Sequence, residues 1–502
     1  MPTPLTTSDF PYGVASGDLT ADSIVLWTKV PVPGSTTDGE VAWWCEPVGV
    51  DGHRGGPRLS GAAAADPTTG SVHVLVTGIG GEQQYEYGFT AGAAASPEGM
   101  FRTLPTDRRA RFAVVCCAKF NSGFFNAYRA LAEMDDIDFV LHLGDYIYEA
   151  AEVPVGKQTP GANIGRPMDP LGTCVSYADY DTRYREYRGD QDLLLLHSRH
   201  AMIATVDDHE LSDNAWSGGA DEHDPARDGS WDDRKKAAMK AWQDWMPTMR
   251  RPLAGGVGEN NHVWQEIPLG DAGRILLCET RLARSDPAAP DGPDKTELGS
   301  AQRDWLMSAL ETPAPGWTFL AMPSMLASVE AAASDPDALF ALRKLKLTDA
   351  DAVETFHDLW GVFAHEKAEL LQAVHAAERT VVLSGDVHFS AEHISTGSST
   401  DEDGGGFVEW TTTSITSPNL DDKMGWPRGA ESRDYEAALL KMLPDLQWCD
   451  LDSHGFLVVE AGPQSVSCQW WFVDTVREVS DVSVMGHEVV IPVHPVGESQ
   501  PV

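Results

Sequence analysis

Hydrophobic residues in the first hundred positions come in short runs that Gly, Pro and Asp separate. Several runs alternate hydrophobic and polar side chains, which is the pattern of a half-buried strand. The predicted strands cover residues 23–28, 41–45, 71–76 and 84–89. Short strands at this spacing are typical of an immunoglobulin- or fibronectin-like β-sandwich, which we expect at residues 8–105. The turn-forming segment 104–107 would then act as a hinge.

After residue 110 the pattern changes, because hydrophobic strands now alternate with segments of helical periodicity. This alternation indicates a layered α/β domain, expected at residues 110–475 and followed by a C-terminal tail at 476–502. Its predicted strands cover residues 111–115, 139–143, 202–206, 380–383, 407–413, 455–460 and 466–471, and its predicted helices 127–134, 180–196, 231–246, 301–310 and 355–377. Polar loops at 156–176, 217–230, 284–299 and 397–406 are long for a compact domain and predict functional or mobile segments.

Acidic side chains outnumber basic ones by 76 to 37 over the 502 residues, which gives a net charge of −39. This excess argues against nucleic acid as a partner, because phosphate backbones bind basic surfaces. It would also repel an anionic substrate unless bound cations reversed the charge locally, although solubility or adaptation to salt would explain it too. No hydrophobic run approaches the ~20 residues of a transmembrane helix, and the N-terminus lacks the features of a signal peptide.

The seven cysteines have no regular spacing, and an odd number leaves at least one thiol unpaired within the chain. Cys278 and Cys468 lie in hydrophobic runs and are expected to be buried. The adjacent Cys116 and Cys117 are not expected to form a disulfide with each other. A thiolate at Cys117 would be held deprotonated by a nearby metal. The disulfide status of the others, Cys45, Cys174 and Cys449, stays open.

Side chains of metal-binding types follow four of the predicted strands. The carboxyl ends of neighbouring strands meet at one edge of a sheet, so residues far apart in sequence can assemble into one site. The four stretches are Cys116-Cys117, Gly144-Asp145-Tyr146-Ile147-Tyr148, Asp207-Asp208-His209-Glu210 and Gly385-Asp386-Val387-His388. Together they predict a dinuclear metallohydrolase. The chain has neither the G-x-S-x-G motif of serine hydrolases nor a P-loop.

The stretch after residues 139–143 suits a position between two ions. Gly144 allows the chain to turn sharply, and Asp145 then projects at the strand end, where one carboxylate can bridge two cations. Tyr148 could return to the same ion as a phenolate, which is a ligand better suited to ferric iron than to zinc or magnesium. The structural alternative is an aspartate that caps the next helix and a tyrosine in the core.

Asp386 and His388 stand two positions apart, so an extended chain would point both side chains the same way, towards two neighbouring ions. Residues 207–210 are four ionisable residues in a row, and unpaired buried charge is costly unless a metal offsets it. Asp208 is therefore a predicted ligand. His209 is predicted to stabilise charge in the transition state or to protonate the leaving oxygen. A structural histidine at 388 and an exposed charged loop at 207–210 are the alternatives.

These motifs resemble the PhoD-like family of alkaline phosphatases and phospholipases D, which is related to the purple acid phosphatases. The resemblance covers almost the whole chain, and its most specific block is Leu-His-Leu-Gly-Asp-Tyr-Ile-Tyr-Glu at 141–149. Further matching blocks are residues 10–18, 25–28, 96–103, 179–188, 384–388 and 454–456. The resemblance implies a four-layer α/β/β/α metallophosphoesterase domain behind the sandwich. It also implies a secreted or periplasmic protein, although the family's export signal is not seen here.

The resemblance further implies two metal sites. Ferric iron would be held by Cys117, Asp145, Tyr148 and His388. A second ion, calcium or alternatively manganese, zinc or magnesium, would draw on Asp145, Asp208 and Asp386. His209 falls where related phosphatases place a histidine that touches the reacting phosphate.

Two motifs depart from the family pattern. The family's Ser-Cys-Gln reads Cys116-Cys117-Ala118 in this chain, so the residue beside the expected iron ligand is altered. The family's Asp-Thr-Arg reads Glu279-Thr280-Arg281. No role is assigned to Glu279 or Arg281 from the sequence.

These observations predict a metal-dependent phosphoric ester hydrolase. Two cations would clamp the phosphoryl group and acidify a bound water, whose hydroxide attacks phosphorus in line with the leaving oxygen. Phosphodiesters, including phospholipid head groups, are the expected substrates, because the resemblance includes phospholipases D and the long loops could surround a bulky molecule. His209 and Arg166 are the predicted substrate-binding residues. The alternatives are an alkaline phosphomonoesterase and, from another class, an acidic calcium-binding adhesion module.

Overall fold

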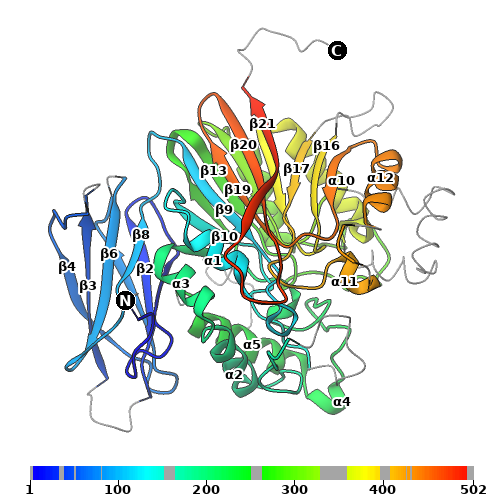
Figure 1. Ribbon diagram of the computed structural model, residues 1–502. Coiled ribbons are helices and arrows are strands. Elements are labelled where there is room, and N and C mark those ends of the chain that lie inside the picture. Colours follow the sequence, from blue (N-terminus) through cyan, green and yellow to red (C-terminus); the bar gives the residue numbers. More distant parts are fainter. Residues whose placement is uncertain are drawn as a thin grey trace.

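The computed structural model describes residues 4–32, 39–49, 52–80, 82–151, 164–249, 263–327, 359–395, 407–425, 427–429 and 432–493. A small all-β part stands beside a larger part in which two sheets and several helices are layered (Figure 1). The predicted loop 397–406, most of the first half of the predicted loop 156–176, and residues 355–358 of a predicted helix lie outside the described residues. No helix within the described ranges combines the length and the apolar composition that crossing a bilayer requires.

The N-terminal part is a β-sandwich, as predicted. One of its sheets has the order β4-β3-β6-β7, with β8 paired to β6, and the strands that face it are β1, β2 and β5. Hydrophobic residues alternate along these strands, and Ile24 and Leu26 of one face share a buried core with Tyr87 and Phe89 of the other. The strands are β1 (Val14–Gly17), β2 (Ser23–Lys29), β3 (Glu40–Val48), β4 (Leu59–Ala64), β5 (Ser71–Thr77), β6 (Gln84–Ala91), β7 (Ala94–Ala95) and β8 (Gly99–Arg102).

A nine-stranded sheet runs from the C-terminal strands through the larger part and into the sandwich, in the order β21-β20-β19-β9-β10-β11-β1-β2-β5. The neighbours β9, β10 and β11 are parallel, so their carboxyl ends lie at one edge. The strands new to this sheet are β9 (Ala110–Val115), β10 (Phe139–His142), β11 (Met202–Ala204), β19 (Gly455–Ala461), β20 (Ser465–Val473) and β21 (Ser483–Pro492). The segment expected to be a C-terminal tail thus contributes an outer strand, β21.

The second sheet of the larger part has seven strands in the order β12-β13-β14-β15-β17-β16-β18. Its central strands β13, β14, β15 and β17 are parallel. The strands are β12 (Gln265–Pro268), β13 (Gly273–Leu277), β14 (Trp317–Ala321), β15 (Thr380–Ser384), β16 (Ser390–Ser395), β17 (Phe407–Thr411) and β18 (Leu446–Asp450). The carboxyl end of β15 leads into the predicted Asp386-His388 stretch.

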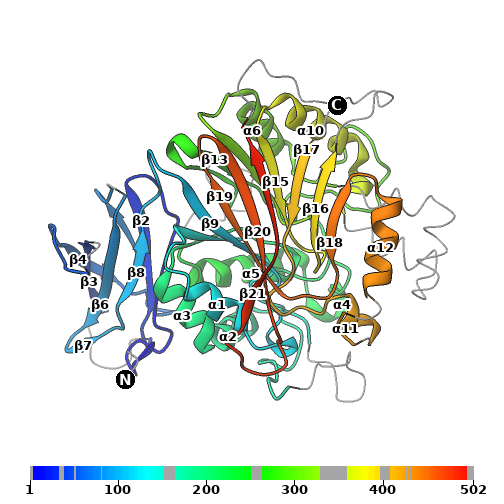
Figure 2. The same cartoon turned by 45° about the horizontal axis from the view of Figure 1, so that its top comes forward.

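The two sheets face each other, and helices cover their outer sides (Figure 2). Phe112 of β9 stacks on Phe139 of β10 at 5.2 Å and meets Phe319 of β14 edge-on at 5.3 Å, which places these rings between the sheets. The alternate residues of the same strands, Ala113 and Val140, pack in a different core with the helices. Strands buried on both faces read as continuous hydrophobic runs, which is what the sequence has here. The four layers α/β/β/α are therefore confirmed.

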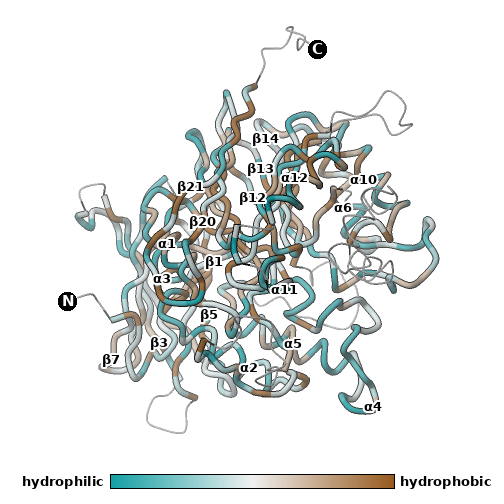
Figure 3. Tube along the Cα trace, turned by 45° about the vertical axis from the view of Figure 1, so that its right-hand side comes forward, coloured by the Kyte–Doolittle hydropathy of each residue, from teal (hydrophilic) through white to brown (hydrophobic). Residues whose placement is uncertain are grey.

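The helices divide between the two sheets according to which core they join. Helices α1 (Asn126–Ala132), α2 (Tyr177–Tyr187), α3 (Gln191–Arg199) and α5 (Trp231–Trp245) pack on the nine-stranded sheet. Helices α6 (Ser300–Glu311) and α10 (Ala364–Ala376) pack on the seven-stranded one. Three more helices are α4 (Pro225–Asp228), α11 (Leu420–Met424) and α12 (Ser432–Met442). In a hydropathy colouring, hydrophobic positions concentrate in the central strands, whereas the outer helix α4 is hydrophilic (Figure 3).

The single helix predicted at 180–196 is two helices, α2 and α3. The break falls at Gly189-Asp190, where the Asp190 side chain accepts hydrogen bonds from the backbone N–H groups of Asp192 and Leu193. An aspartate in this position is a strong N-cap, so it begins a new helix rather than continuing the old one. Local capping chemistry therefore outweighed the continuous periodicity.

The sandwich is fixed to the larger part by hydrogen bonds as well as by packing. Strand β1 pairs in parallel with β11 at Gly17 and Met202. A Cβ atom on Gly17 would lie 2.3 Å from the Met202 carbonyl oxygen and 2.6 Å from that of Pro247, so only glycine permits this approach. The buried Trp27 also donates its indole N–H to the Asp244 carbonyl at 3.0 Å. The two parts share a sheet, so the hinge predicted at 104–107 is wrong.

All seven cysteines are free thiols with buried side chains. This confirms that Cys116 and Cys117 are not linked to each other. It also confirms burial of Cys278 and Cys468, which belong to two different hydrophobic cores. Cys45, Cys174 and Cys449, whose status was open, are unpaired as well.

Candidate metal centre

The four polar stretches that follow predicted strands come together at one place. The Cys117 backbone N–H donates to the Gly144 carbonyl at 3.2 Å, and the His209 N–H donates to Asp145 Oδ1 at 3.2 Å. Gly385, after β15, approaches Cys116 so closely that a Cβ atom there would lie 2.6 Å from the Cys116 Sγ atom. The site thus forms where the carboxyl ends of strands from both sheets converge. In open α/β sheets, sites form in the same way at the carboxyl ends of strands of one sheet.

The backbone at this convergence is strained. Four of its residues, Cys117, Asp145, Asp386 and His388, have left-handed φ angles of 59°, 54°, 68° and 60°. Residues other than glycine rarely adopt this region, and such strain gathers at functional sites where the surroundings impose it. The turn also corrects one expectation. β15 ends at Ser384, so Asp386 and His388 do not lie on one side of an extended strand.

One group of possible ligands consists of Cys117, Asp145 and His388, whose ligand atoms all lie within 4.8 Å of one another. The Tyr148 hydroxyl joins this group, since its oxygen lies 3.1 Å from His388 Nε2. The other ring nitrogen of His388 lies 3.1 Å from the Pro418 carbonyl oxygen. A carbonyl acceptor at Nδ1 fixes the ring and leaves Nε2 to face the group, which is the usual arrangement of a metal-binding histidine.

A second group shares Asp145 and contains only carboxylates. Asp145, Asp207, Asp208 and Asp386 each place an oxygen within 4.8 Å of the others, and Asp145, Asp208 and His209 form an overlapping set. Because Asp145 belongs to both the first and the second group, its carboxylate is in position to bridge two ions. Asp207 was not among the predicted ligands. Its neighbour in sequence, Asp208, was.

The donors fit two cations of different chemistry. Thiolate, phenolate and imidazole ligands beside one carboxylate suit a transition metal, whereas an all-carboxylate group suits a hard divalent ion. Burial raises the pKa values of Cys117, Tyr148 and Asp145, and neighbouring carboxylates raise that of Asp145 further against the effect of His209. Asp208 Oδ1 is buried without a hydrogen-bond partner. A cation would offset each of these costs.

Arg281, to which sequence reasoning assigned no role, places a positive charge inside the carboxylate group. Its fully buried guanidinium pairs with Asp207 and lies 3.8 Å from Asp208 Oδ1 and 3.5 Å from Asp386 Oδ2. Glu279 fixes the turn that carries it, because Glu279 Oε2 accepts the backbone N–H groups of Arg281 and Leu282 at 2.8 and 2.7 Å. These two residues therefore position the carboxylates. The family triplet, which this chain matches at Arg281 and changes at Glu279, was the signal that pointed to them.

Glu210 is a further residue that sequence reasoning left without a role. It is fully buried, and Oε2 accepts the backbone N–H groups of Asp145 and Asp207 at 2.9 and 2.7 Å, while Oε1 accepts that of Tyr146 at 2.6 Å. Burial raises the pKa of Glu210 to about 8. The Glu210 side chain thus holds in place both the turn at residues 145–146 and the turn at residue 207. Only its position beside three other ionisable residues marked it in the sequence.

His209 lies between the ligands and a buried carboxylate. Its Nδ1 is 2.7 Å from Glu149 Oε2, and Glu149 is fully buried, with Oε1 accepting the Asp213 N–H at 2.8 Å. Burial lowers the pKa of His209, but Asp208, Asp145 and Glu149 raise it well above its ordinary value. The imidazolium form is therefore favoured. Its ring stands 4.0 Å from that of Tyr148.

Two lysines add positive charge at the same place. The Lys119 ammonium lies 5.4 Å from the centre of the Tyr148 ring and interacts electrostatically with Glu149 and Asp213. Lys423 of α11 interacts in the same way with Asp386. In a chain with a net charge of −39 these two lysines, together with Arg281, make the site locally less negative. The sequence did not single them out.

Arg166 does not belong to the ligand groups described above. Its guanidinium donates to Asp190 Oδ2 at 2.8 Å and to the Phe120 carbonyl at 3.0 Å, and it stacks 3.8 Å from the Phe120 ring. These bonds hold Arg166 between Asp190, just before α3, and Phe120, six residues ahead of α1. A substrate-binding role for Arg166 stays a prediction.

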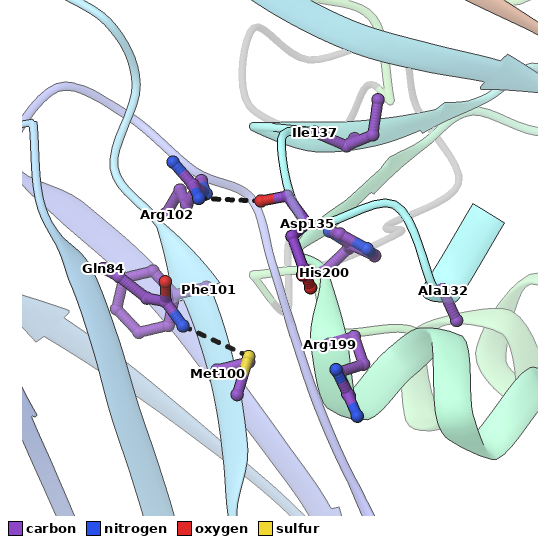
Figure 4. A pocket seen from close by; sticks show the side chains of 9 residues that line it. All are labelled: Gln84, Met100, Phe101, Arg102, Ala132, Asp135, Ile137, Arg199 and His200. Carbon is purple, nitrogen blue, oxygen red and sulfur yellow. Dashed lines mark hydrogen bonds between the residues drawn. The ribbon is translucent and has the colours of Figure 1, made fainter. Parts of the chain in front are cut away.

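A cavity of about 310 Å³ lies elsewhere, between the sandwich and the ends of α1 and α3 (Figure 4). It is lined by Gln84, Met100, Phe101 and Arg102 from the sandwich and by Arg199 and His200 at the end of α3. None of the candidate ligands lines it. The cavity is therefore a feature of the junction, and the chemistry lies at the strand ends.

Comparison with known proteins identifies the family. The sequence pattern of the PhoD-like phosphatase family matches residues 112–470, and that of the PhoD-like phosphatase N-terminal domain matches residues 2–105. The chain belongs to the PhoD-like phosphatase family. Among members of this family, alkaline phosphatase D of Bacillus subtilis (strain 168) is 27% identical over 492 residues, covering 92% of this chain and 77% of the relative.

A solved structure titled "Structure of PhoD" has the same fold. It superposes with a TM-score of 0.79 at 24% identity, and the match covers 97% of this chain and 91% of the other. Family membership confirms the resemblance drawn from the strand-end motifs. The protein is a PhoD-like phosphatase, a metal-dependent hydrolase of phosphate esters, so the alternative of an adhesion module is excluded.

Proposed function

We propose that this phosphatase acts on phosphodiesters, phospholipid head groups among them, in preference to phosphomonoesters. The observation that carries the proposal is the net charge of −39. A phosphodiester carries one negative charge, whereas a phosphomonoester at alkaline pH carries two. Long-range repulsion by the acidic protein therefore opposes the approach of the monoester more strongly. The same reasoning favours zwitterionic or small soluble diesters over anionic lipid surfaces.

We assign the proposed ligands to two metal ions according to the type of their donor atoms. Ferric iron would be bound by Cys117, Asp145, Tyr148 and His388. Calcium, or else manganese, zinc or magnesium, would be bound by Asp145, Asp208 and Asp386. Support comes from the closeness of the ligand atoms and from the shared position of Asp145.

The protein's own residues would act on the leaving group and on charge. Bound cations would polarise the phosphoryl group and acidify a water molecule. His209, whose protonated form the buried Glu149 carboxylate favours, would donate its Nε2 proton to the leaving oxygen. Glu149 would keep the ring oriented through its 2.7 Å bond to Nδ1. Arg281 would hold Asp207, Asp208 and Asp386 in place.

Substrate preference is tested by three assays on the purified, metal-loaded protein. We expect a higher kcat/KM for bis-p-nitrophenyl phosphate and phosphatidylcholine than for p-nitrophenyl phosphate. The opposite order would overturn the diester proposal in favour of an alkaline phosphomonoesterase. That second candidate has its own support, since Lys119 and Lys423 bring two positive charges towards the site and would favour a dianion.

The iron site is tested by colour. Thiolate and phenolate ligands give ferric proteins charge-transfer absorption, so Tyr148→Phe should shift or remove a visible band. Tyr87→Phe is the matched control, because Tyr87 is equally buried but lies in the sandwich core. A colourless, iron-free protein with full activity would exclude ferric iron.

The divalent site is tested by substitution of its carboxylates. Asp208→Ala and Asp386→Ala should each lose most activity at low divalent concentration while circular dichroism stays unchanged. Either variant that keeps a near wild-type kcat under those conditions would show that the residue is not a ligand. Chelation should have the same effect as substitution on the wild-type protein, and added divalent metal should reverse it.

An exported location, secreted or periplasmic, is also proposed, on the strength of the family resemblance alone. Cell fractionation of the source organism with an antibody against this protein would test it. Recovery with cytoplasmic markers would contradict it.

A further inference from the structure

A second cluster of carboxylates lies at the outer end of the seven-stranded sheet, apart from the metal centre. Glu436 of α12, Asp450 at the end of β18 and Asp452 each place one oxygen within 4.8 Å of the other two. None of them belongs to the ligand groups around Asp145. Helices α11 and α12 stand next to each other at this end of the molecule in both views (Figures 1 and 2).

Hydrogen bonds hold these carboxylates in fixed positions. Glu436 Oε1 accepts the Leu451 N–H at 3.1 Å, which ties α12 to the residue between the two aspartates. Asp452 Oδ2 accepts the Ser432 hydroxyl at 2.6 Å, and Asp450 accepts the Ser453 N–H at 2.7 Å. All these donors are neutral. They orient the oxygens but leave three like charges close together.

Asp421 of α11 provides a fourth carboxylate next to the cluster. The backbone N–H of its neighbour, Leu420, donates to the Leu451 carbonyl at 3.2 Å, which brings the start of α11 against residues 450–452. Asp421 is only 8% exposed, and its Oδ1 is buried without a hydrogen-bond partner. Burial, with the charges of Asp422 and Asp452, raises its pKa to about 6. An unpartnered carboxylate oxygen that is this buried points to an absent positive partner.

Cations in the vicinity are engaged elsewhere. Arg477 pairs with Asp422, and His454 lies 3.6 Å from the same carboxylate. Arg428 donates to the Val473 and Asp474 carbonyl oxygens and to the Ser453 hydroxyl. Arg433, the residue after Ser432, is exposed and attracts Glu436 only through its charge. The negative charge of the cluster is therefore not offset by an ion pair with these side chains.

We propose that Glu436, Asp450 and Asp452, together with Asp421, bind one calcium ion that is separate from the metal centre. The cluster offers oxygen ligands only and several carboxylates, which is the donor set of Ca²⁺ rather than of zinc or iron. The ion would join α11, α12 and the end of β18. The Pro418 carbonyl, just before α11, accepts a hydrogen bond from His388. A calcium ion that fixes α11 would therefore also stabilise the position of His388 at the metal centre.

The test counts calcium ions on the full chain. Equilibrium dialysis is carried out in an Asp386→Asn background, in which calcium binding at the metal centre is weakened. Glu436→Gln should reduce the bound calcium by about one ion per chain, or weaken that ion's affinity at least tenfold. It should also remove the rise in Tm that calcium produces in the Asp386→Asn parent.

Asp434→Asn is the matched control, since Asp434 is an exposed carboxylate on the same helix outside the cluster. It should bind calcium as the parent does. If Glu436→Gln does not fold, Asp421→Asn replaces it, with the same expected loss. Equal calcium stoichiometry, affinity and Tm shift in the parent, Glu436→Gln, Asp421→Asn and Asp434→Asn would overturn the proposal.

Discussion

Among single residues, the candidate ligands combine metal-binding side chains with a backbone conformation that is rare outside glycine. The sequence predicted Cys117, Asp145 and His388 as ligands because each follows a hydrophobic run that marks a strand end. It did not predict their left-handed backbone, since only glycine usually signals that conformation in a sequence. The same gap explains the wrong geometry expected for Asp386 and His388, which lie in a turn.

Arg281 supplies a prediction at this scale. Lysine keeps its charge but not its planar fork, so Arg281→Lys should lower kcat/KM at least tenfold by misplacing Asp207, Asp208 and Asp386. Arg281→Met leaves buried carboxylates uncompensated and should lower the free energy of unfolding by about 3 kcal/mol. Activity assays on the metal-loaded protein measure the first effect, and urea titrations in metal-free buffer measure the second.

Arg303 provides the control for these substitutions, because it is partly exposed and its partner Asp304 lies at the surface. Arg303→Lys and Arg303→Met should leave activity unchanged and alter stability by less than about 0.5 kcal/mol. Wild-type kcat/KM in Arg281→Lys would show that Arg281 fills space without positioning the carboxylates.

At the scale of whole elements, strands buried on both faces were the easiest to predict, because β9, β10 and β15 each contain an uninterrupted hydrophobic run. β21 was missed for the opposite reason. Most of its residues are exposed or half-buried, and its edge position leaves no hydrophobic pattern strong enough to separate it from a tail. The split between α2 and α3 depended on one cap at Asp190, which periodicity alone does not reveal.

The connection between the sandwich and β9 gives a pH-dependent prediction. Burial alone would raise the pKa of Glu82, but hydrogen bonds from Thr106 and Asp107 lower it to about 2. A carboxyl whose pKa is lowered by folding stabilises the protein above its unfolded pKa, and loses that effect as pH falls towards its folded pKa. Glu82→Gln should therefore cost about 1 kcal/mol at pH 7, and the difference from wild type should shrink between pH 4.5 and pH 2.

Urea midpoints at several pH values would measure this difference. Glu40→Gln serves as the control, since Glu40 is an exposed residue at the start of β3. It should match the wild type throughout. A Glu82→Gln penalty that stays constant from pH 7 to pH 2 would show that the hydrogen bonds, and not the charge, hold the connection.

For the molecule as a whole, the charge of −39 governs how substrates arrive. Salt screens long-range repulsion, so the KM for an anionic ester should fall about two- to fivefold between 10 and 200 mM NaCl at fixed divalent concentration. Choline chloride should act in the same way, because the effect is one of ionic strength. A KM that rises with salt would show that the nearby Lys119 and Lys423 dominate the field that substrates meet.

The shared sheet has a consequence for the two family domains, which are separate along the chain at 2–105 and 112–470 but continuous in their hydrogen bonding. Removing the first would turn β11 into a bare edge strand with a hydrophobic face. Such an edge is a template on which another chain can add its own strand, so the catalytic part expressed alone should self-associate. The N-terminal domain therefore protects the catalytic domain from aggregation by covering this edge within the same polypeptide.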